Sequence, residues 1–238
     1  GSMGTKGMTA LVNAADTFID TLKDASPDSQ VAVVYFNGSQ GEDKEASTTK
    51  FKEFTKLNAP ANVTSIKDFL SNSNNMTPSG GTPMGNALKK AKSLLDADNT
   101  GNQQYVLFFT DGLPGYWDGN DNKNCMVANS AVNYANDIKA KATIYTVGYK
   151  LSGTLDWHKG DSATSSADTE HGYYSGWGWE QKYYSNHDLS TSASDFLKDY
   201  IATSVSAGSN SKYAYTVDDT ANLEAEFKKL AAQIGAYY

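Results

Sequence analysis

The sequence predicts an α/β fold in which a doubly wound, mostly parallel sheet is flanked by helices on both faces. Three continuous apolar runs at 31–36, 105–109 and 143–147 support this prediction, because parallel strands that are buried on both faces show such runs. Stretches with apolar residues at helical spacing lie between them, and this alternation is typical of a doubly wound sheet. We expect residues 1–238 to form a single domain, since this length suits one α/β domain with a substantial core.

The first predicted element is an amphipathic helix over about 5–23, which Pro27 separates from a strand at 30–36. That strand is a continuous run of apolar, mostly β-branched residues, so we expect it to be buried on both faces. Residues 51–57 alternate apolar and polar side chains. This alternation predicts an exposed antiparallel strand at the edge of the sheet.

Two helices are predicted next, at about 63–71 and 83–96. The second is expected to begin with Thr82 as its N-cap and Pro83 at its first helical position. The rest of the chain continues the alternation of strands and helices. It predicts a strand at 105–109, a helix at 127–139, a strand at 143–149, a helix at about 193–205, a strand at 213–217 and a final helix with Leu223, Phe227, Leu230 and Ile234 on one face.

Composition narrows the classes of partner. The net charge is -7 and all 20 basic residues are Lys, so the bidentate guanidinium contacts of base and phosphate recognition are unavailable. We therefore expect no nucleic-acid partner. No segment approaches the apolar length of a membrane helix, so we expect no membrane insertion. Abundant Ser, Thr, Asn, Gly and Tyr with a single Cys favour an extracellular protein of the bacterial cell wall or a pilus.

Cysteine and histidine give little indication of catalysis. Cys125 either forms a disulfide with a residue outside 1–238 or is a small buried hydrophobe at a helix start. The three His residues fit no compact zinc-ligand spacing, and the sequence has no Gly-x-Ser-x-Gly nucleophile elbow. We therefore expect no enzyme activity.

Three short segments place oxygen-bearing side chains at helix starts or strand ends. They are Gly1-Ser2-Met3, Ser79-Gly80-Gly81-Thr82-Pro83-Met84 and Phe108-Phe109-Thr110-Asp111-Gly112. Taken singly, Thr82 is an ordinary helix cap and Asp111-Gly112 an ordinary turn. At the carboxyl edge of one parallel sheet, however, such positions can share a hard divalent cation. In this order the three segments resemble the von Willebrand factor A domain with its metal-ion-dependent adhesion site.

This resemblance implies a metal site in which Ser2, Thr82 and Asp111 match ligand positions. The two hydroxyls would ligate the ion, and the carboxylate would act mostly through water. The expected ion is Mg²⁺, with Mn²⁺ or Ca²⁺ as alternatives. Because few carboxylates contact it, the ion keeps much of its charge and an open position that attracts an acidic side chain. The implied partner is a host or matrix protein or glycan, bound through the metal face.

The resemblance also implies a strand that the sequence lacks. The family's first and most central strand, with the start of the metal motif, would precede Gly1. We expect an N-terminal part or another chain to supply it, because an open slot between apolar strands exposes unpaired backbone groups. Alternatively, Gly1-Ser2-Met3 originates from cloning and mimics the motif, and the strand is missing in that case too.

An aromatic-rich insertion at about 151–190 follows the strand at 143–149. It would leave the carboxyl edge of the sheet, where long loops commonly hold function. Two interpretations stay open: the rings form a surface that stacks on sugars or packs on protein, or they bury one another beneath the loop. The candidate ligand-binding residues are Trp157, Tyr173, Trp177 and Trp179, together with Tyr116 and Trp117 just after Asp111.

Three functions compete at this point. The first is a metal-dependent adhesion domain of a surface or pilus protein of a Gram-positive bacterium. The second is a structural or assembly module of such a protein, without metal-dependent ligand binding. The third is a module attached to an enzyme such as a metal chelatase, and the lack of Arg together with the Tyr-, Asn- and Ser-rich insertion favours the extracellular functions over it. An effect of cations on partner binding separates the first from the second.

Overall fold

The chain consists of two units that interleave along the sequence. Unit 1 contains Gly1–Tyr35, Lys50–Pro78 and Val217–Tyr238, and unit 2 contains Phe36–Thr49 and Ser79–Thr216. The prediction of a single domain over 1–238 stays a prediction. The computed structural model describes residues 3–38, 49–75, 80–115, 121–159, 172–175, 178–181, 189–204 and 212–236.

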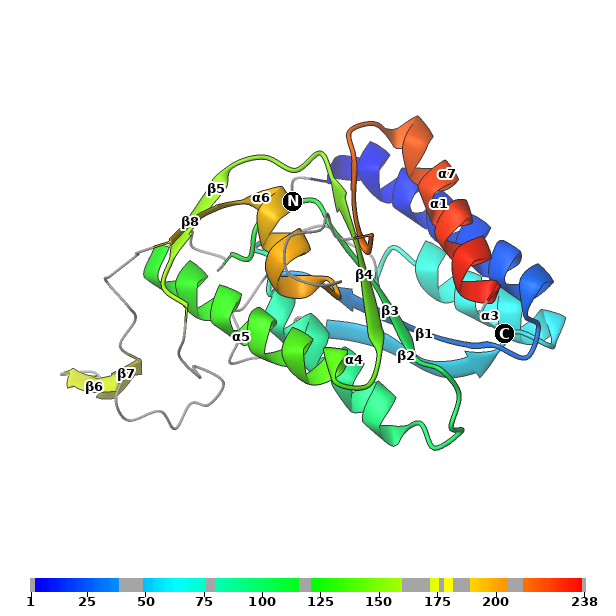
Figure 1. Cartoon of the computed structure of the whole chain (residues 1–238), viewed down its shortest axis with the longest axis horizontal. Helices are drawn as coiled ribbons and strands as arrows, with labels where there is room; N and C mark the ends of the chain where they lie inside the picture. Colours follow the sequence, from blue (N-terminus) through cyan, green and yellow to red (C-terminus); the bar gives the residue numbers. More distant parts are fainter. Residues whose placement is uncertain are drawn as a thin grey trace. The chain divides into compact units, whose positions relative to one another are not determined.

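Two helices form the centre of unit 1. They are α1 (Gly4–Ala25) and α7 (Thr220–Gly235), and they lie side by side (Figure 1). Phe18 and Phe227 meet edge to face with ring centroids 6.3 Å apart, a favourable arrangement for an aromatic pair. The predicted first and last helices are therefore confirmed.

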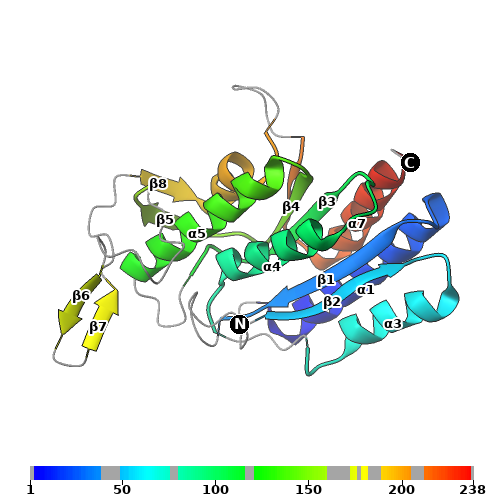
Figure 2. The same cartoon turned by 90° about the horizontal axis from the view of Figure 1, so that it is seen from below.

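The strands of unit 1 are β1 (Gln30–Phe36), whose last residue belongs to unit 2, and β2 (Thr49–Lys56). They run side by side (Figure 2), and α3 (Pro60–Ser71) follows them in the chain. The expectation that β1 is buried on both faces is wrong, because all of its residues are half-buried. Among the described strands β1 pairs with β2 alone. The antiparallel direction of β2 stays a prediction.

A parallel pair of strands organises unit 2. β3 (Tyr105–Thr110) pairs with β4 (Thr143–Tyr149) from Tyr105 opposite Thr143 to Thr110 opposite Gly148. β9 (Ala214–Val217), whose last residue belongs to unit 1, pairs with the other edge of β4. β4 has a neighbouring strand on each side, and it is buried along almost all of its length. The predicted parallel sheet is confirmed.

Two helices of unit 2 pack against each other, α4 (Met84–Ala97) and α5 (Asp121–Lys139). α5 also contacts β4 and starts earlier than the predicted residue 127. Asp96 accepts hydrogen bonds from Lys92 at 2.7 Å and from Lys141, which follows α5, and these bonds hold the pKa of Asp96 below its usual range. None of the helices in the described ranges has the length and apolar character of a membrane span.

Two antiparallel strand pairs lie in the predicted aromatic insertion. β5 (Thr154–Trp157) pairs with β8 (Leu189–Ser192), with Trp157 opposite Leu189. Between them in the chain, β6 (Gly172–Ser175) pairs with β7 (Gly178–Gln181). The sequence patterns did not indicate these four short strands, and β5 and β8 make a stem for the segment that connects them.

The helix predicted at about 193–205 is shorter and wider than expected. It starts as α6 (Ala193–Asp195) and continues as a π-helix, η1 (Phe196–Ile201). Ala202 N–H donates to Leu197 O at 2.8 Å, five residues back, and this wide turn ends the helix. Lys139 Nζ donates to Tyr200 O at 2.9 Å, which satisfies one of the last carbonyls.

The surroundings of Asp16 in α1 disfavour its charge. Its Oδ1 atom is buried and has no hydrogen-bond partner in the part of the chain that the structure describes. Burial raises the pKa of Asp16, the charge of Lys67 opposes this shift, and the charge of Asp20 adds to it. Because the folded-state pKa lies above the unfolded value, the carboxylate destabilises the fold above that pKa, and the cost disappears as the pH falls through it.

We therefore expect Asp16→Asn to increase the free energy of unfolding at about pH 7 and to lose this advantage in the acid range. The gain should stay below about 1 kcal/mol, because the half-buried side chain keeps contact with solvent. Urea unfolding of both proteins from about pH 7 to about pH 3 measures it. Asp20→Asn is the control and should give no gain, since Asp20 Oδ2 accepts from Lys67 Nζ at 2.7 Å. A gain for Asp16→Asn that is independent of pH would contradict the explanation.

Candidate metal centre

Asp111 directly follows the last residue of β3, and a pair of hydrogen bonds shapes its turn. The buried Thr110 hydroxyl accepts from Gly112 N–H at 3.3 Å and donates to Gly112 O at 3.1 Å. Both bonds span Asp111, so they hold this residue at the carboxyl end of the strand. The turn at Asp111-Gly112 thus depends on the residue before it.

Thr82 lies beside the same turn. Thr82 N–H donates to Gly115 O at 2.8 Å, and Gly115 N–H donates to Thr82 O at 3.2 Å, so the two residues form an isolated antiparallel bridge. A Cβ atom added to Gly112 would lie 3.7 Å from Thr82 Oγ1. The structure therefore brings together the segments of Thr82 and Asp111, which are distant in sequence.

The predicted capping role of Thr82 is wrong. α4 begins at Met84 with Pro83 as its N-cap residue, and this residue makes no side-chain capping hydrogen bond. Thr82 precedes the cap, and its backbone is engaged with Gly115, while its carbonyl accepts from Met84 N–H at 2.8 Å. The local sequence suggested a cap because Thr before Pro commonly starts a helix, but pairing with the loop after β3 moves Thr82 outside the helix.

One oxygen of Asp111 has no hydrogen-bond partner among the described residues. This atom, Oδ2, is shielded from solvent, and no donor in the described ranges bonds to it. A buried carboxylate oxygen in this state is costly unless a donor or a cation satisfies it. Carboxylate and hydroxyl oxygens are the ligands that hard divalent cations prefer, so Asp111 with the adjacent Thr82 fits a site for such an ion.

The third predicted ligand, Ser2, lies outside the described residues, and its place at the centre stays a prediction. Within the described ranges, no group of three or more His, Cys, Asp or Glu side chains is arranged to hold a metal.

Comparison with known proteins decides the family. A family model described as the von Willebrand factor type A domain matches residues 1–191, which is most of the chain. The chain belongs to the von Willebrand factor type A family. The resemblance seen in the three motif segments is confirmed, as is the doubly wound α/β fold. None of the curated proteins compared with this von Willebrand factor type A chain matches it.

Solved structures with a similar fold include a pilus adhesin. Two crystal structures of the pilus adhesin SpaC from Lactobacillus rhamnosus GG match with TM-scores of 0.63 and 0.64 at 14% and 13% identity, over 98% and 99% of this chain. A von Willebrand factor type A protein from Catenulispora acidiphila matches with a TM-score of 0.58 at 15% identity, over 98% of this chain. At such identities the likeness shows the fold. The chain spans 28% of the SpaC chain and 39% of the Catenulispora chain.

The structure describes only some of the aromatic residues that were predicted to bind a ligand in this von Willebrand factor type A domain. Tyr116, Trp117 and Trp177 lie outside the described residues. The backbone of Tyr173 lies in β6 opposite Glu180, and that of Trp179 lies in β7 opposite Tyr174. Ligand binding by these five predicted residues stays a prediction.

Trp157 has a structural role. It is fully buried, and its Nε1 donates to Thr191 Oγ1 at 3.0 Å across the β5–β8 pair. Its ring meets Phe196 and Tyr200 edge-on, with centroids 5.4 Å and 4.9 Å away. The expectation that Trp157 offers its ring to a ligand is wrong, because β8 and η1 cover it. Trp157 is buried, as the second interpretation expected, but its aromatic partners belong to η1 and not to the insertion.

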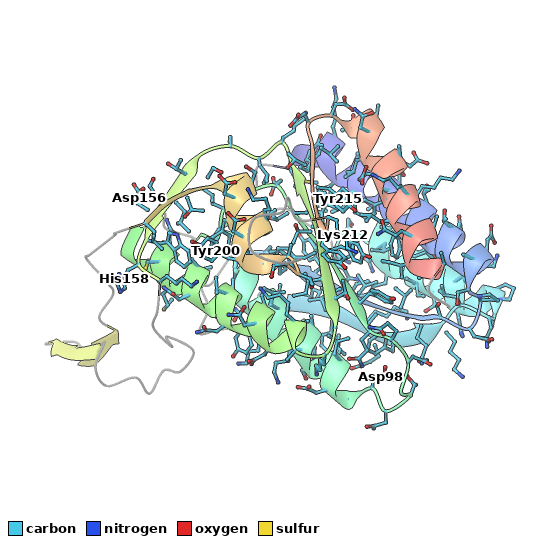
Figure 3. The ribbon with its side chains drawn as sticks, in the orientation of Figure 1. Asp98, Asp156, His158, Tyr200, Lys212 and Tyr215 are labelled. Atoms are coloured by element: carbon cyan, nitrogen blue, oxygen red, sulfur yellow. The ribbon has the colours of Figure 1, made fainter. Side chains whose placement is uncertain are left out.

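The end of β5 is attached to α5 by Cys125. The thiol is fully buried and accepts from His158 N–H at 3.3 Å. One turn along α5, Asn129 Nδ2 donates to His158 O at 2.8 Å. Figure 3 shows His158 beside the start of α5 and Tyr200 on η1. Cys125 is therefore a small buried residue of unit 2, as the second interpretation of the sequence proposed.

Sequence reasoning missed the residues that arrange the centre, namely Gly38, Thr110 and Gly115. Thr110 offered a weak signal, because a Thr before Asp-Gly can bond to the turn that follows. The roles of Gly38 and Gly115 depend on backbone contacts between distant segments, which no local pattern reveals.

We expect Trp157→Ala to lower the free energy of unfolding by about 3–5 kcal/mol, because it leaves a cavity beneath the stem. Thr191→Val keeps the shape but leaves the indole N–H without its acceptor, which should cost about 1–3 kcal/mol. Denaturant unfolding of both variants measures these losses. A Trp157→Ala protein as stable as the wild type would show that the ring is not part of the core.

Proposed function

We propose that this domain is a metal-dependent adhesion domain of a bacterial surface or pilus protein, located outside the cell. The observation that carries the proposal is the buried Oδ2 of Asp111, which has no partner among the described residues, in a loop whose backbone pairs with Thr82. Both residues lie at the carboxyl end of β3, the edge at which open α/β sheets commonly bind ligands. Ser2 would complete the set of ligands.

The chemistry of these ligands favours binding over catalysis. Two hydroxyls and one carboxylate leave a divalent ion with much of its positive charge and with room for another oxygen. An acidic side chain of a partner protein, or an acidic group of a glycan, can fill that position. Mg²⁺ is the expected ion, because it prefers oxygen ligands and keeps several waters; Mn²⁺ and Ca²⁺ are the alternatives.

The likeness to SpaC supports the location. SpaC is a pilus adhesin, and this chain has the fold of a part that makes up 28% of that protein. We propose that the present domain has a comparable place in a larger surface protein and binds a host or matrix protein or glycan. The Ser-, Asn- and Tyr-rich composition and the net charge of -7 are compatible with an exposed surface outside the cell.

We expect Asp111→Asn to abolish stabilisation by Mg²⁺. For the wild type, Mg²⁺ at 100 times its Kd should raise the free energy of unfolding by about 2.7 kcal/mol. Without metal, the variant should be at least as stable as the wild type, because it removes a carboxylate oxygen that is buried without a partner. Thermal or urea unfolding with Mg²⁺ and with chelator measures both effects.

Asp156→Asn is the matched control, since Asp156 is an exposed carboxylate of β5 in the same unit. It should keep the full effect of Mg²⁺. Loss of stability in Asp111→Asn under chelation would indicate an ordinary structural carboxylate. An equal Mg²⁺ effect in the wild type and in Asp111→Asn would reject the site.

Trp177→Ala should lower partner affinity and leave Mg²⁺ affinity unchanged if the aromatic insertion recognises the partner. The measurement is binding of the immobilised domain to a panel of matrix proteins and glycans, with Mg²⁺ or with chelator. Chelation and Asp111→Asn should weaken the same interactions to the same degree. Binding that ignores chelator and Asp111→Asn would favour an assembly module over a metal-dependent adhesin.

A further inference from the structure

We propose that Gly38 is a positioning residue for the metal centre: the lack of a side chain at Gly38 determines where Thr82 lies, and hence how tightly the centre holds a divalent cation. This inference rests on the proposed metal-dependent function. It extends the candidate centre to the turn after β1, a segment that contains no metal ligand.

The backbones of Gly38 and Gly81 are in direct contact. Gly38 is buried, and its carbonyl accepts from Gly81 N–H at 3.2 Å. Gly38 forms isolated bridges with both Gly80 and Gly81. A Cβ atom added to Gly38 would overlap the N, Cα and carbonyl C atoms of Gly81. Since these are backbone atoms, a side chain at 38 would have to move the whole Gly80–Thr82 segment.

Such a movement reaches Thr82 directly. Gly81 is covalently joined to Thr82, whose N–H and carbonyl are both bonded to Gly115. The segment is thus held on one side by Gly38 and on the other by the loop that begins at Asp111. Because Mg²⁺ requires near-ideal octahedral geometry at short distances, a shift of the Thr82 hydroxyl relative to Asp111 should reduce affinity.

The steric constraint is particular to Gly38 among the glycines compared at this edge. A Cβ atom on Gly112 or Gly115 would meet its nearest neighbours at 3.7 Å, an ordinary contact distance. Neither glycine has a positive φ, so Ala is compatible with its backbone. Gly115→Ala is therefore a matched control: it adds the same methyl group where there is room for it, and it keeps the backbone N–H and carbonyl through which residue 115 contacts Thr82.

The experiment compares Gly38→Ala and Gly115→Ala with the wild-type chain. In metal-free protein, the Gly81 and Thr82 amides should exchange with solvent at least about 10-fold faster in Gly38→Ala. Titration calorimetry with Mg²⁺ alone should show an affinity about 10- to 100-fold weaker in Gly38→Ala, the range expected when support of a ligand is lost. Gly115→Ala should stay within about twofold of the wild type, since its Cβ meets only ordinary contacts.

A combination with Thr82→Val separates positioning from general loosening. If Gly38 acts through the Thr82 hydroxyl, Gly38→Ala should weaken Mg²⁺ binding no further in the Thr82→Val background. Additive losses would overturn the proposal, as would wild-type Mg²⁺ affinity or unchanged amide exchange in Gly38→Ala. A wild type that binds no Mg²⁺ would instead reject the proposed metal-dependent function, and the inference with it.

If Gly38→Ala does not fold, the wild type supplies the test. Mg²⁺ at 100 times its Kd should slow exchange of the Gly81 and Thr82 amides together, by about 100-fold, because opening this contact must release the ion. The Ala142 amide, bonded to Ile138 O at 2.8 Å at the end of α5, is the internal control and should not change. Slowing at Thr82 without slowing at Gly81 would overturn the role of Gly38.

Discussion

Parallel pairing of β3 with β4 is the constraint on which the candidate centre depends. Parallel strands need a crossover connection, here through α5, so their carboxyl ends lie at one edge of the sheet. The pair ends with Thr110 opposite Gly148, and Asp111 is the next residue. β4 is buried almost throughout and has strands on both sides. A polar residue placed just beyond this rigid pair therefore has a defined position.

In the candidate centre, hydrogen bonds hold the backbone in place, but one carboxylate oxygen of Asp111 has no hydrogen-bond partner among the described residues. Buried side-chain oxygens without partners occur, among the described residues, at Asp16, Ser29, Asp111 and Thr146. Asp111 differs from the others because it follows a strand end and lies in the loop that pairs with Thr82. A cation from solution could offset the desolvation cost of the Asp111 carboxylate. This possibility separates a candidate binding site from a carboxylate that only destabilises the fold. Hydrogen bonds of Thr110, Gly81 and Gly115 hold the site in place without contributing charge.

One aromatic residue of the insertion, Trp157, has a structural purpose. Trp157 is core, because the hydrogen bond to Thr191 and the rings of Phe196 and Tyr200 enclose it. The backbone of His158 is attached to Cys125 and Asn129 of α5. These contacts attach the β5–β8 stem to α5 and η1 within unit 2. Composition alone treats all these rings alike, and only the structure shows that Trp157 is buried.

Hydrophobic periodicity by itself determined the helices, the apolar strands and the order in which they alternate, because each depends on neighbours a few residues away. The motif segments with Thr82 and Asp111 were also local, so family and candidate ligands followed from them. Only the tertiary structure decided that β1 is half-buried, that α4 starts after Thr82, and that Trp157 is covered. It also revealed the contact of Gly38 with Gly81. Each of these features depends on which segment, distant in sequence, packs against the residue. Local sequence patterns do not specify such long-range contacts.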